Sequence, residues 1–96
     1  IPYEKILAFE KDKRKVVVLT SAGKDYSFYG KFEEFMEDLD ENFIRCHNSI
    51  IVNVSRVEKM EKGNLFLEYG NGYIIIPISR AYMKEVREVF NNMLAM

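Results

Sequence analysis

The sequence has few of the residues that form disulfides and metal sites. Its 96 residues include one cysteine, one histidine, two prolines and no tryptophan. A lone Cys46 excludes an internal disulfide, and together with one histidine it falls short of the four ligands of a structural zinc site. The longest apolar stretches, residues 50–52 and 73–76, are far below the roughly 20 residues that cross a bilayer. We therefore expect no membrane association, and a lone cysteine fits the reducing cytoplasm.

The length is that of one ordinary domain, residues 1–96. No basic segment followed by an apolar segment marks a secretory signal, and the sequence begins at Ile1. We therefore expect an excised domain with a partner domain upstream.

Charge is nearly balanced, with 14 Lys and Arg against 15 Asp and Glu and a net charge of −1. This balance argues at first against nucleic acid, because DNA binding draws much affinity from basic residues. However, residues 33–41 hold six of the carboxylates, which leaves nine against fourteen basic residues elsewhere, a net charge of +5. An acidic segment that faces away would leave a basic surface free for DNA, whereas a merely solvated helix face explains the same carboxylates.

Short apolar runs separated by turn residues predict a mainly β protein of about eight or nine strands. Runs at 6–9 and 16–20 flank a charged connection, and alternation at 25–28 predicts a third strand. The runs 43–45 and 50–54 flank a polar turn, and we expect hairpin turns at 62–64 and 70–72. The β-branched run 73–76 is predicted to be buried. The aromatic and aliphatic candidates for the core are Phe9, Phe28, Phe43, Tyr73 and Ile75.

Two segments have helical spacing. From Lys31 onward, apolar residues recur every three or four positions with carboxylates on the other face, which predicts a short amphipathic helix. Those apolar residues are Phe32, Phe35, Met36 and Leu39. Near the end of the chain, Ser79 is placed to cap a second helix, whose apolar face would hold Tyr82, Met83, Val86, Val89 and Phe90.

An enzyme is not expected. His47 is the only histidine, and its possible nucleophiles, Ser49 and Cys46, are such close neighbours that an extended segment would point them to different faces. No nucleophile-elbow glycines surround them, and no phosphate-binding loop or calcium-loop spacing occurs, so the sequence implies no cofactor.

Residues 43–53 read F-I-R-C-H-N-S-I-I-V-N, which resembles the F-x-R-x-H-x-S-x-x-V-N signature of the LytTR family of DNA-binding domains in bacterial response regulators. Residues 6–10 are similar to the family's I-x-x-x-E element, and residues 77–80 to its terminal P-V-S-R. Within the family, residues 46–49 and 28–30 look closest to the accessory gene regulator type of quorum-sensing regulators.

The resemblance implies an elongated fold of several small antiparallel sheets that inserts loops, rather than a recognition helix, into successive major grooves. The family contacts DNA from three places. Their counterparts here are Lys13, Arg14 and Lys15, then Asn48 and Ser49, then Ser79 and Arg80. Relatives of the accessory gene regulator type often carry a histidine at the first place, where this chain has none.

Each candidate has a functional and a structural interpretation. The guanidinium fork of Arg80 suits the O6 and N7 of guanine, which the motif favours over the alternative of an ion pair with a surface glutamate. Arg14 and Lys15 could reach a base or phosphate. Alternatively, they could form a solvated charged turn that keeps the sheet edge from pairing with another chain. Asn48 suits adenine or a bridging water, or simply closes an Asx turn.

Three neighbouring residues have less direct roles. Arg45 could neutralise a phosphate. His47 could orient the loop through hydrogen bonds or contact DNA directly, and we assign it the supporting role. Cys46 fits a small buried hydrophobe, because a redox switch needs an exposed thiol with a lowered pKa.

The resemblance thus implies the output domain of a two-component response regulator, with a receiver domain upstream, a cognate sensor kinase, and dimers on direct repeats of promoter DNA. The alternative is a β-rich protein-interaction module that recruits a partner at an exposed strand edge without binding DNA.

Overall fold

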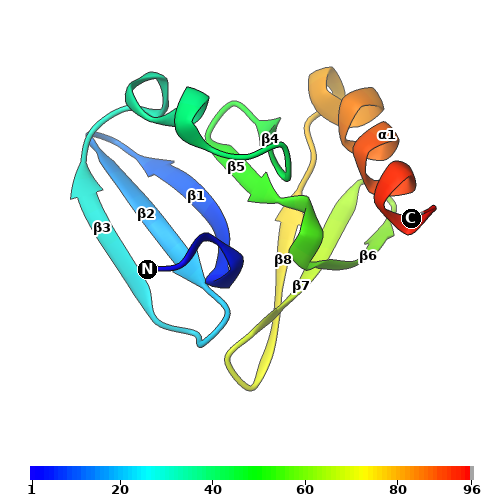
Figure 1. The fold of residues 1–96 in the computed structure, drawn as a ribbon, viewed down its shortest axis with the longest axis horizontal. Helices are drawn as coiled ribbons and strands as arrows, with labels where there is room; N and C mark the ends of the chain where they lie inside the picture. Colours follow the sequence, from blue (N-terminus) through cyan, green and yellow to red (C-terminus); the bar gives the residue numbers. More distant parts are fainter. Residues whose placement is uncertain (96) are drawn as a thin grey trace.

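Antiparallel strands dominate the computed structural model, which describes residues 1–95 (Figure 1). Within these residues the chain forms eight strands and one α-helix. The strands are β1 (Ile6–Asp12), β2 (Lys15–Thr20), β3 (Asp25–Tyr29), β4 (Phe43–His47), β5 (Ile50–Asn53), β6 (Val57–Glu61), β7 (Asn64–Tyr69) and β8 (Gly72–Pro77), and the helix is α1 (Met83–Leu94). Short 3-10 turns lie at η1 (Tyr3–Lys5), η2 (Phe32–Glu34), η3 (Met36–Asp38), η4 (Val54–Arg56) and η5 (Arg80–Tyr82). The predicted mainly β class is confirmed.

The strands form two sheets. A five-stranded sheet has the order β3-β2-β1-β5-β4, and a three-stranded sheet has the order β6-β7-β8. The turns that join the strands of the second sheet lie where the sequence predicts them. Lys62 and Gly63 connect β6 to β7 with φ angles of 49° and 78°, a left-handed pair typical of two-residue hairpin turns.

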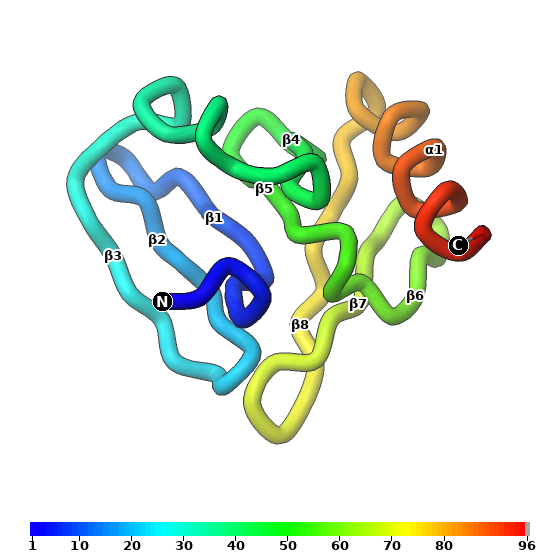
Figure 2. The backbone as a smooth tube through the Cα atoms, viewed as in Figure 1, coloured from blue at the N-terminus to red at the C-terminus, as the bar shows by residue number. Residues whose placement is uncertain are grey.

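The two sheets are joined at one end by their turns. The amide of Gly70, in the β7–β8 turn, donates to the carbonyl of Ser21 at 2.9 Å, and the two turns lie side by side in Figure 2. A Cβ atom on Gly23 would approach the Cα of Gly70 to 3.0 Å, so this contact requires glycine. The sheets therefore meet at the end of the molecule opposite the β1–β2 turn.

The core has two parts. One lies between the sheets and α1, centred on buried residues such as Leu7, Val52 and Leu65, and Val86 anchors the helix to it. The other covers one face of the five-stranded sheet and includes Phe9 and Phe43. The predicted burial of these two phenylalanines is confirmed.

Three other core predictions are wrong. Tyr73 and Ile75 are 61% and 55% exposed, because β8 is an outer strand and these residues lie on the face of its sheet away from the core, while Ile76 points inward. Phe28 is 42% exposed, because β3 is the edge of the five-stranded sheet, although its ring still packs edge-on against Phe35.

The segment after Lys31 is not the predicted amphipathic helix. It forms the separate turns η2 and η3, divided at Phe35, whose backbone (φ −137°, ψ −8°) is not helical. Carboxylates four residues apart, such as Glu33 and Glu37, repel each other on a helix, and a nine-residue segment gains too little to offset nucleation. Its apolar residues nevertheless face the sheet, as the spacing predicts: Phe32 is buried, and Phe35, Met36 and Leu39 pack against the second core.

The C-terminal helix begins later than predicted. Ser79 precedes η5 and makes no side-chain cap; its carbonyl instead accepts from the amide of Tyr82 at 3.0 Å. The helix α1 starts at Met83, with Val89 and Phe90 half-buried against the core, as predicted. No helix within residues 1–95 is long and apolar enough to cross a membrane.

Candidate nucleic-acid interface

The three candidate segments come together along one edge of the molecule, the upper edge in Figure 1. Since β1 and β5 are antiparallel, the β1–β2 turn and the β4–β5 turn lie at the same end of the sheet. Two main-chain hydrogen bonds join the segments: the amide of Lys11 donates to the carbonyl of Ser49 at 2.7 Å, and the amide of Ser79 donates to the carbonyl of Cys46 at 2.9 Å. The residues predicted from three distant parts of the chain thus occupy one surface.

The first segment is a tight hairpin turn. Asp12 pairs with Lys15, which leaves Lys13 and Arg14 exposed at the tip. Lys13 has a φ of 59°, in the left-handed region. The ammonium of Lys15 lies 5.4 Å from the ring centroid of Tyr29, a cation–π arrangement that directs it toward β3 and away from the tip. Lys13 and Arg14 are therefore the better-placed members of the trio.

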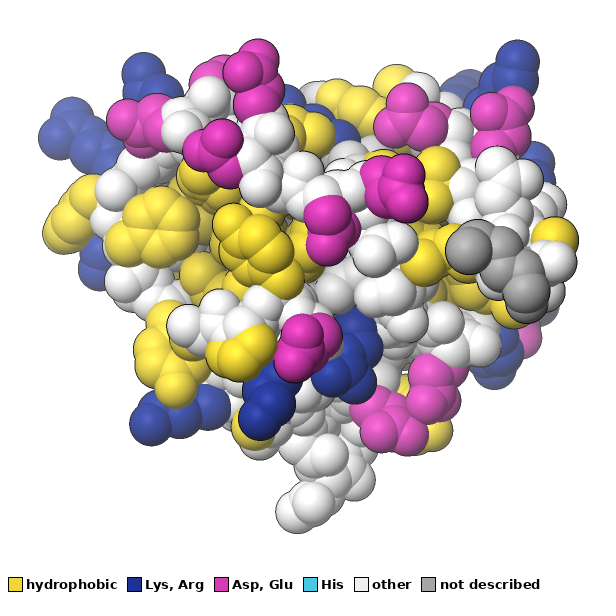
Figure 3. Space-filling model, viewed as in Figure 1, with side chains coloured by type: hydrophobic (Ala, Val, Ile, Leu, Met, Phe, Trp, Pro, Cys, Tyr) yellow, Lys and Arg dark blue, Asp and Glu magenta, His cyan; other side chains and the backbone are white. Residues whose placement is uncertain are grey.

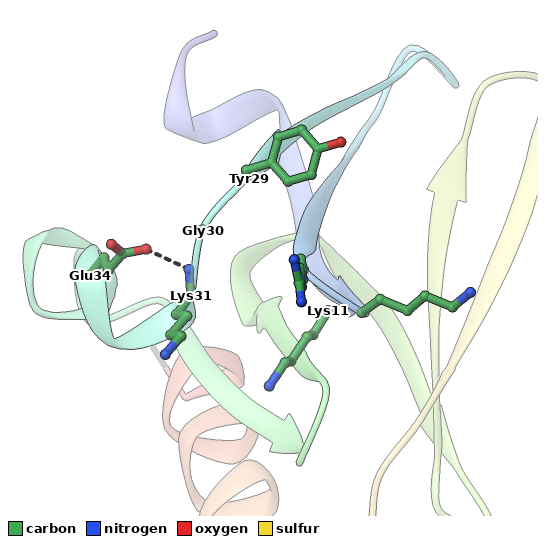
Figure 4. A pocket seen from close by; sticks show the side chains of 7 residues that line it. Lys11, Tyr29, Gly30, Lys31 and Glu34 are labelled. Atoms are coloured by element: carbon green, nitrogen blue, oxygen red, sulfur yellow. Dashed lines mark hydrogen bonds between the residues drawn. The ribbon is translucent and has the colours of Figure 1, made fainter.

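Two further basic residues, Lys11 and Lys31, line an open groove beside this turn (Figure 4). The groove, with a volume of about 490 Å³, is also lined by Lys13 and Arg14. Lys11 belongs to the charged run that the sequence shows, but Lys31 follows β3 and reaches the groove only because β3 pairs with β2. The sequence signal for Lys31 is its place just beyond the predicted third strand, which would have to be known to pair beside the basic turn.

The acidic segment does not face away from this surface. Glu34 lines the same groove, and its carboxylate accepts from the backbone amide of Lys31 at 2.6 Å (Figure 4). In the space-filling view, acidic side chains over η2 and η3 lie next to basic ones at the upper edge (Figure 3). The charges are separated along the chain but adjacent in space, so the positive potential of the first segment is moderated.

The second segment, the β4–β5 turn, is held from inside by Arg45 and His47. The Nη2 of Arg45 donates to the carbonyl of Asn48 at 2.6 Å, and its guanidinium carbon lies 5.2 Å from the ring centroid of Phe32. Its Nε is buried and has no partner among the described residues. This geometry favours a role in bracing the turn over a phosphate contact.

His47 supports the same turn. Its Nδ1 accepts from the amide of Ser49 at 3.1 Å, which requires an unprotonated Nδ1. Among the hydrogen bonds of residues 1–95, none joins the ring to the hydroxyl of Ser49 or to the thiol of Cys46. The contact of His47 with the turn fits the supporting role predicted for it, and its contribution to DNA binding stays a prediction.

The third segment presents Arg80 at the start of η5. Its side chain is exposed, and no hydrogen bond or ion pair between side chains of the described residues involves it. Ser79 is half-buried beneath it. Two residues further on, the hydroxyl of Tyr82 donates to Oδ1 of Asn48 at 3.2 Å and links this segment to the second.

Cys46 lies beneath this edge, fully buried. Burial raises the pKa of its thiol from 9.0 to about 12, partly offset by a main-chain hydrogen bond. A redox switch needs an accessible thiolate, so this geometry favours a structural role.

We expect Cys46 to resist alkylation by iodoacetamide at pH 8 in the folded domain and to react promptly in denaturant. The thiol has a pKa of about 12 in the folded domain, above the ordinary value of 9.0 that applies when the chain unfolds. Its contribution to the free energy of unfolding is therefore complete below pH 9 and falls as the pH rises toward about 12. Mass spectrometry of the alkylated protein and urea unfolding between pH 7 and 10.5 measure both effects. Rapid alkylation under native conditions would contradict the burial of the thiol.

Comparison with known proteins defines the class of this domain. The family model of the LytTr DNA-binding domain matches residues 1–91. The chain therefore belongs to the LytTR family: it is a DNA-binding domain of the kind that regulates transcription in bacterial response regulators, which is not a class of enzymes.

Individual relatives are more specific. The chain is 30% identical to accessory gene regulator protein A of Staphylococcus epidermidis over 73 residues, 75% of this chain and 30% of that protein. It is 29% identical to the Staphylococcus aureus protein of the same name over 72 residues, 74% of this chain and 30% of that protein. The aligned part thus spans about a third of the length of these relatives.

A solved structure shares the fold. The LytTr DNA-binding domain of a putative methyl-accepting/DNA response regulator from Bacillus cereus superposes with a TM-score of 0.74 at 27% identity, covering 93% of this chain and 84% of that one. The expected resemblance to LytTR domains, and to the accessory gene regulator type among them, is confirmed.

Proposed function

We propose that this domain recognises direct repeats in promoter DNA as the output domain of a two-component response regulator, in a quorum-sensing or virulence circuit. Its loops would enter successive major grooves on one side of the duplex and contact the intervening minor groove and phosphates, with Arg14, Asn48 and Arg80 as the candidate base contacts and Lys13 and Ser79 on the backbone. An upstream receiver domain, phosphorylated by a sensor kinase, would dimerise and place two such domains on adjacent repeats. Because the dimer of receiver domains links the two DNA-binding domains, their effective concentration on adjacent repeats rises without new contacts to DNA.

The observation that carries this proposal is the main-chain linkage of three sequence-distant polar segments along one edge, on which the side chain of Arg80 is exposed. The edge is only modestly basic, because Glu34 lies in the groove with the lysines. We therefore expect weak binding to mixed DNA and a specific affinity that depends on a few base contacts.

The test is selection of binding sites from a random duplex library, followed by titration of the enriched and mixed duplexes over a salt series. We expect an enriched site bound about 10³-fold or more tightly than mixed DNA at physiological salt. Failure to enrich any sequence would contradict the proposal.

The alternative, an interaction module without DNA binding, has one observation in its favour. All five residues of the edge strand β3 are exposed, including Tyr26, Phe28 and Tyr29. Such an edge can pair with a strand of a partner protein. Binding of mixed DNA that is undetectable at low salt, together with partner capture that Ser27→Pro in β3 abolishes, would favour this alternative.

We expect Lys13→Asn to weaken binding to all sequences alike and to reduce the salt slope, log Kd against log salt, by about one unit. Asparagine tolerates the left-handed φ of 59° at this position, whereas alanine would add backbone strain to the loss of charge. The measurement is fluorescence anisotropy at several salt concentrations.

The matched control for Lys13→Asn is Lys24→Ala, in the β2–β3 turn at the opposite end of β2. It removes the same charge and should leave the slope unchanged, because it lies away from the candidate edge. Equal slopes for the unsubstituted domain and Lys13→Asn would remove Lys13 from the interface.

A further inference from the structure

We propose that Tyr82 is a positioning residue for base recognition, which holds the carboxamide of Asn48 so that its amino group faces DNA. This inference rests on the proposed function and deepens it. Neither residue type nor spacing in the sequence suggests the pair, since 34 positions separate them.

The backbone around Asn48 is already fixed from several sides. Arg45 holds the carbonyl of Asn48 at 2.6 Å, and His47 and Lys11 hold the amide and carbonyl of Ser49 at 3.1 and 2.7 Å. The remaining freedom of the exposed Asn48 is therefore the rotation of its side chain.

Tyr82 removes that freedom. Its ring is half-buried and packs against the main core, so the hydroxyl is presented from a rigid base at the end of η5. The hydroxyl donates to Oδ1 of Asn48 at 3.2 Å. With Oδ1 engaged, Nδ2 is directed to the other side of the carboxamide, and no side chain or main-chain group of residues 1–95 accepts from it.

The chemical consequence is a bias in the bases that Asn48 can read. A free asparagine presents either an acceptor or a donor and suits adenine, which offers one of each. An asparagine whose oxygen is engaged by Tyr82 presents chiefly its amino donors, which suit the acceptors of the major groove: N7 and O6 of guanine, N7 of adenine, and O4 of thymine. We therefore expect the Asn48 position of the site to favour guanine or thymine over cytosine. Cytosine presents an amino donor in the major groove, so it offers Nδ2 of Asn48 no acceptor.

Tyr82→Phe tests the proposal, because it keeps the ring and removes only the hydroxyl. The probe is the selected duplex and a set in which each base pair is replaced in turn. We expect Tyr82→Phe to bind the selected duplex about 2- to 10-fold more weakly and to lose base preference at one position, the same position where Asn48→Ala loses it. The double substitution should bind no more weakly than Asn48→Ala alone.

The matched control is Tyr69→Phe, which removes a hydroxyl that donates to Asp25 at 2.8 Å at the far end of the sheet. It should leave every base preference unchanged. A uniform loss for Tyr82→Phe across all duplexes, or additive losses in the double substitution, would overturn the positioning role while leaving specific DNA binding intact.

A second readout needs no DNA. In NMR spectra of the free domain, the side-chain amide signals of Asn48 should shift in Tyr82→Phe and stay in place in Tyr69→Phe. Unmoved signals in Tyr82→Phe would overturn the hydrogen bond itself. If the unsubstituted domain selects no DNA site at all, the proposed function falls and this inference falls with it, whatever the spectra show.

Discussion

Arg80→Ala should cost about 1–3 kcal/mol in specific binding, roughly 5- to 150-fold in Kd, and should relax the preference at one base pair. The guanidinium is exposed at the start of η5, and no side-chain hydrogen bond or ion pair within residues 1–95 holds it. A planar fork of donors that meets O6 and N7 of guanine makes two hydrogen bonds that other bases cannot match. Titration of the base-replaced duplexes measures the affinity and the preference together.

The conservative variant separates recognition from charge. Arg80→Lys keeps the positive charge but loses the fork, so it should retain the salt slope and still lose most of the preference at that base pair. Equal weakening on every duplex by both variants would instead make Arg80 a phosphate contact. Lys24→Ala again serves as the control at the opposite end of β2.

The structure disfavours the competing interpretation of Arg80 as half of a surface ion pair. The ion pair found within residues 1–95 joins Lys59 to Glu61, on β6. A guanidinium that has no side-chain partner among the described residues breaks no such contact when it meets DNA, so we expect its truncation to weaken binding far more than it affects folding.

Much of the fold follows from local patterns that the sequence carries. The hairpins β6–β7 and β7–β8 were predictable, because alternating apolar residues flank short turns that contain glycine. The segment 31–39 was not, because the helical spacing of its apolar residues fits two 3-10 turns over a sheet as well as it fits one helix. The exposure of Tyr73 and Ile75 was hidden for a different reason: a uniform run of apolar residues does not reveal which face of an outer strand is covered.

The sequence predicts which residues belong to the candidate site but not how those residues are arranged in space. The motif positions point to Asn48 and Arg80, whose roles toward DNA stay predictions. The contributions of Lys31 and Tyr82 depend on which strand lies beside which, and strand order arises from packing between distant segments. The same holds for Glu34, whose place in the basic groove makes net charge by segment a poor guide to surface potential.

The largest effect on folding should come from Asn53, a polar side chain only 2% exposed. Its Nδ2 donates to the carbonyl of Ile6 at 2.9 Å, which ties β5 to the start of β1, and its Oδ1 accepts from the amide of Ser55 at 3.1 Å, which begins η4. Asn53→Ala leaves both main-chain groups without a partner and opens a small cavity. We expect a loss of about 2–4 kcal/mol in the free energy of unfolding.

Such a loss should lower the Tm by roughly 10–25 °C in a domain of this size. Circular dichroism during heating and urea unfolding measure it, and Ser55→Ala is the control, since it removes only the hydroxyl that also bonds Oδ1 of Asn53 and should cost about 1 kcal/mol. Because Asn53 ends β5 while the candidate edge lies at its start, the folded fraction of Asn53→Ala should keep its base preferences at low temperature. A Tm within a few degrees of the unsubstituted domain would mean that water satisfies the carbonyl of Ile6, and an altered base preference would mean that β5 transmits its strain to the β4–β5 turn.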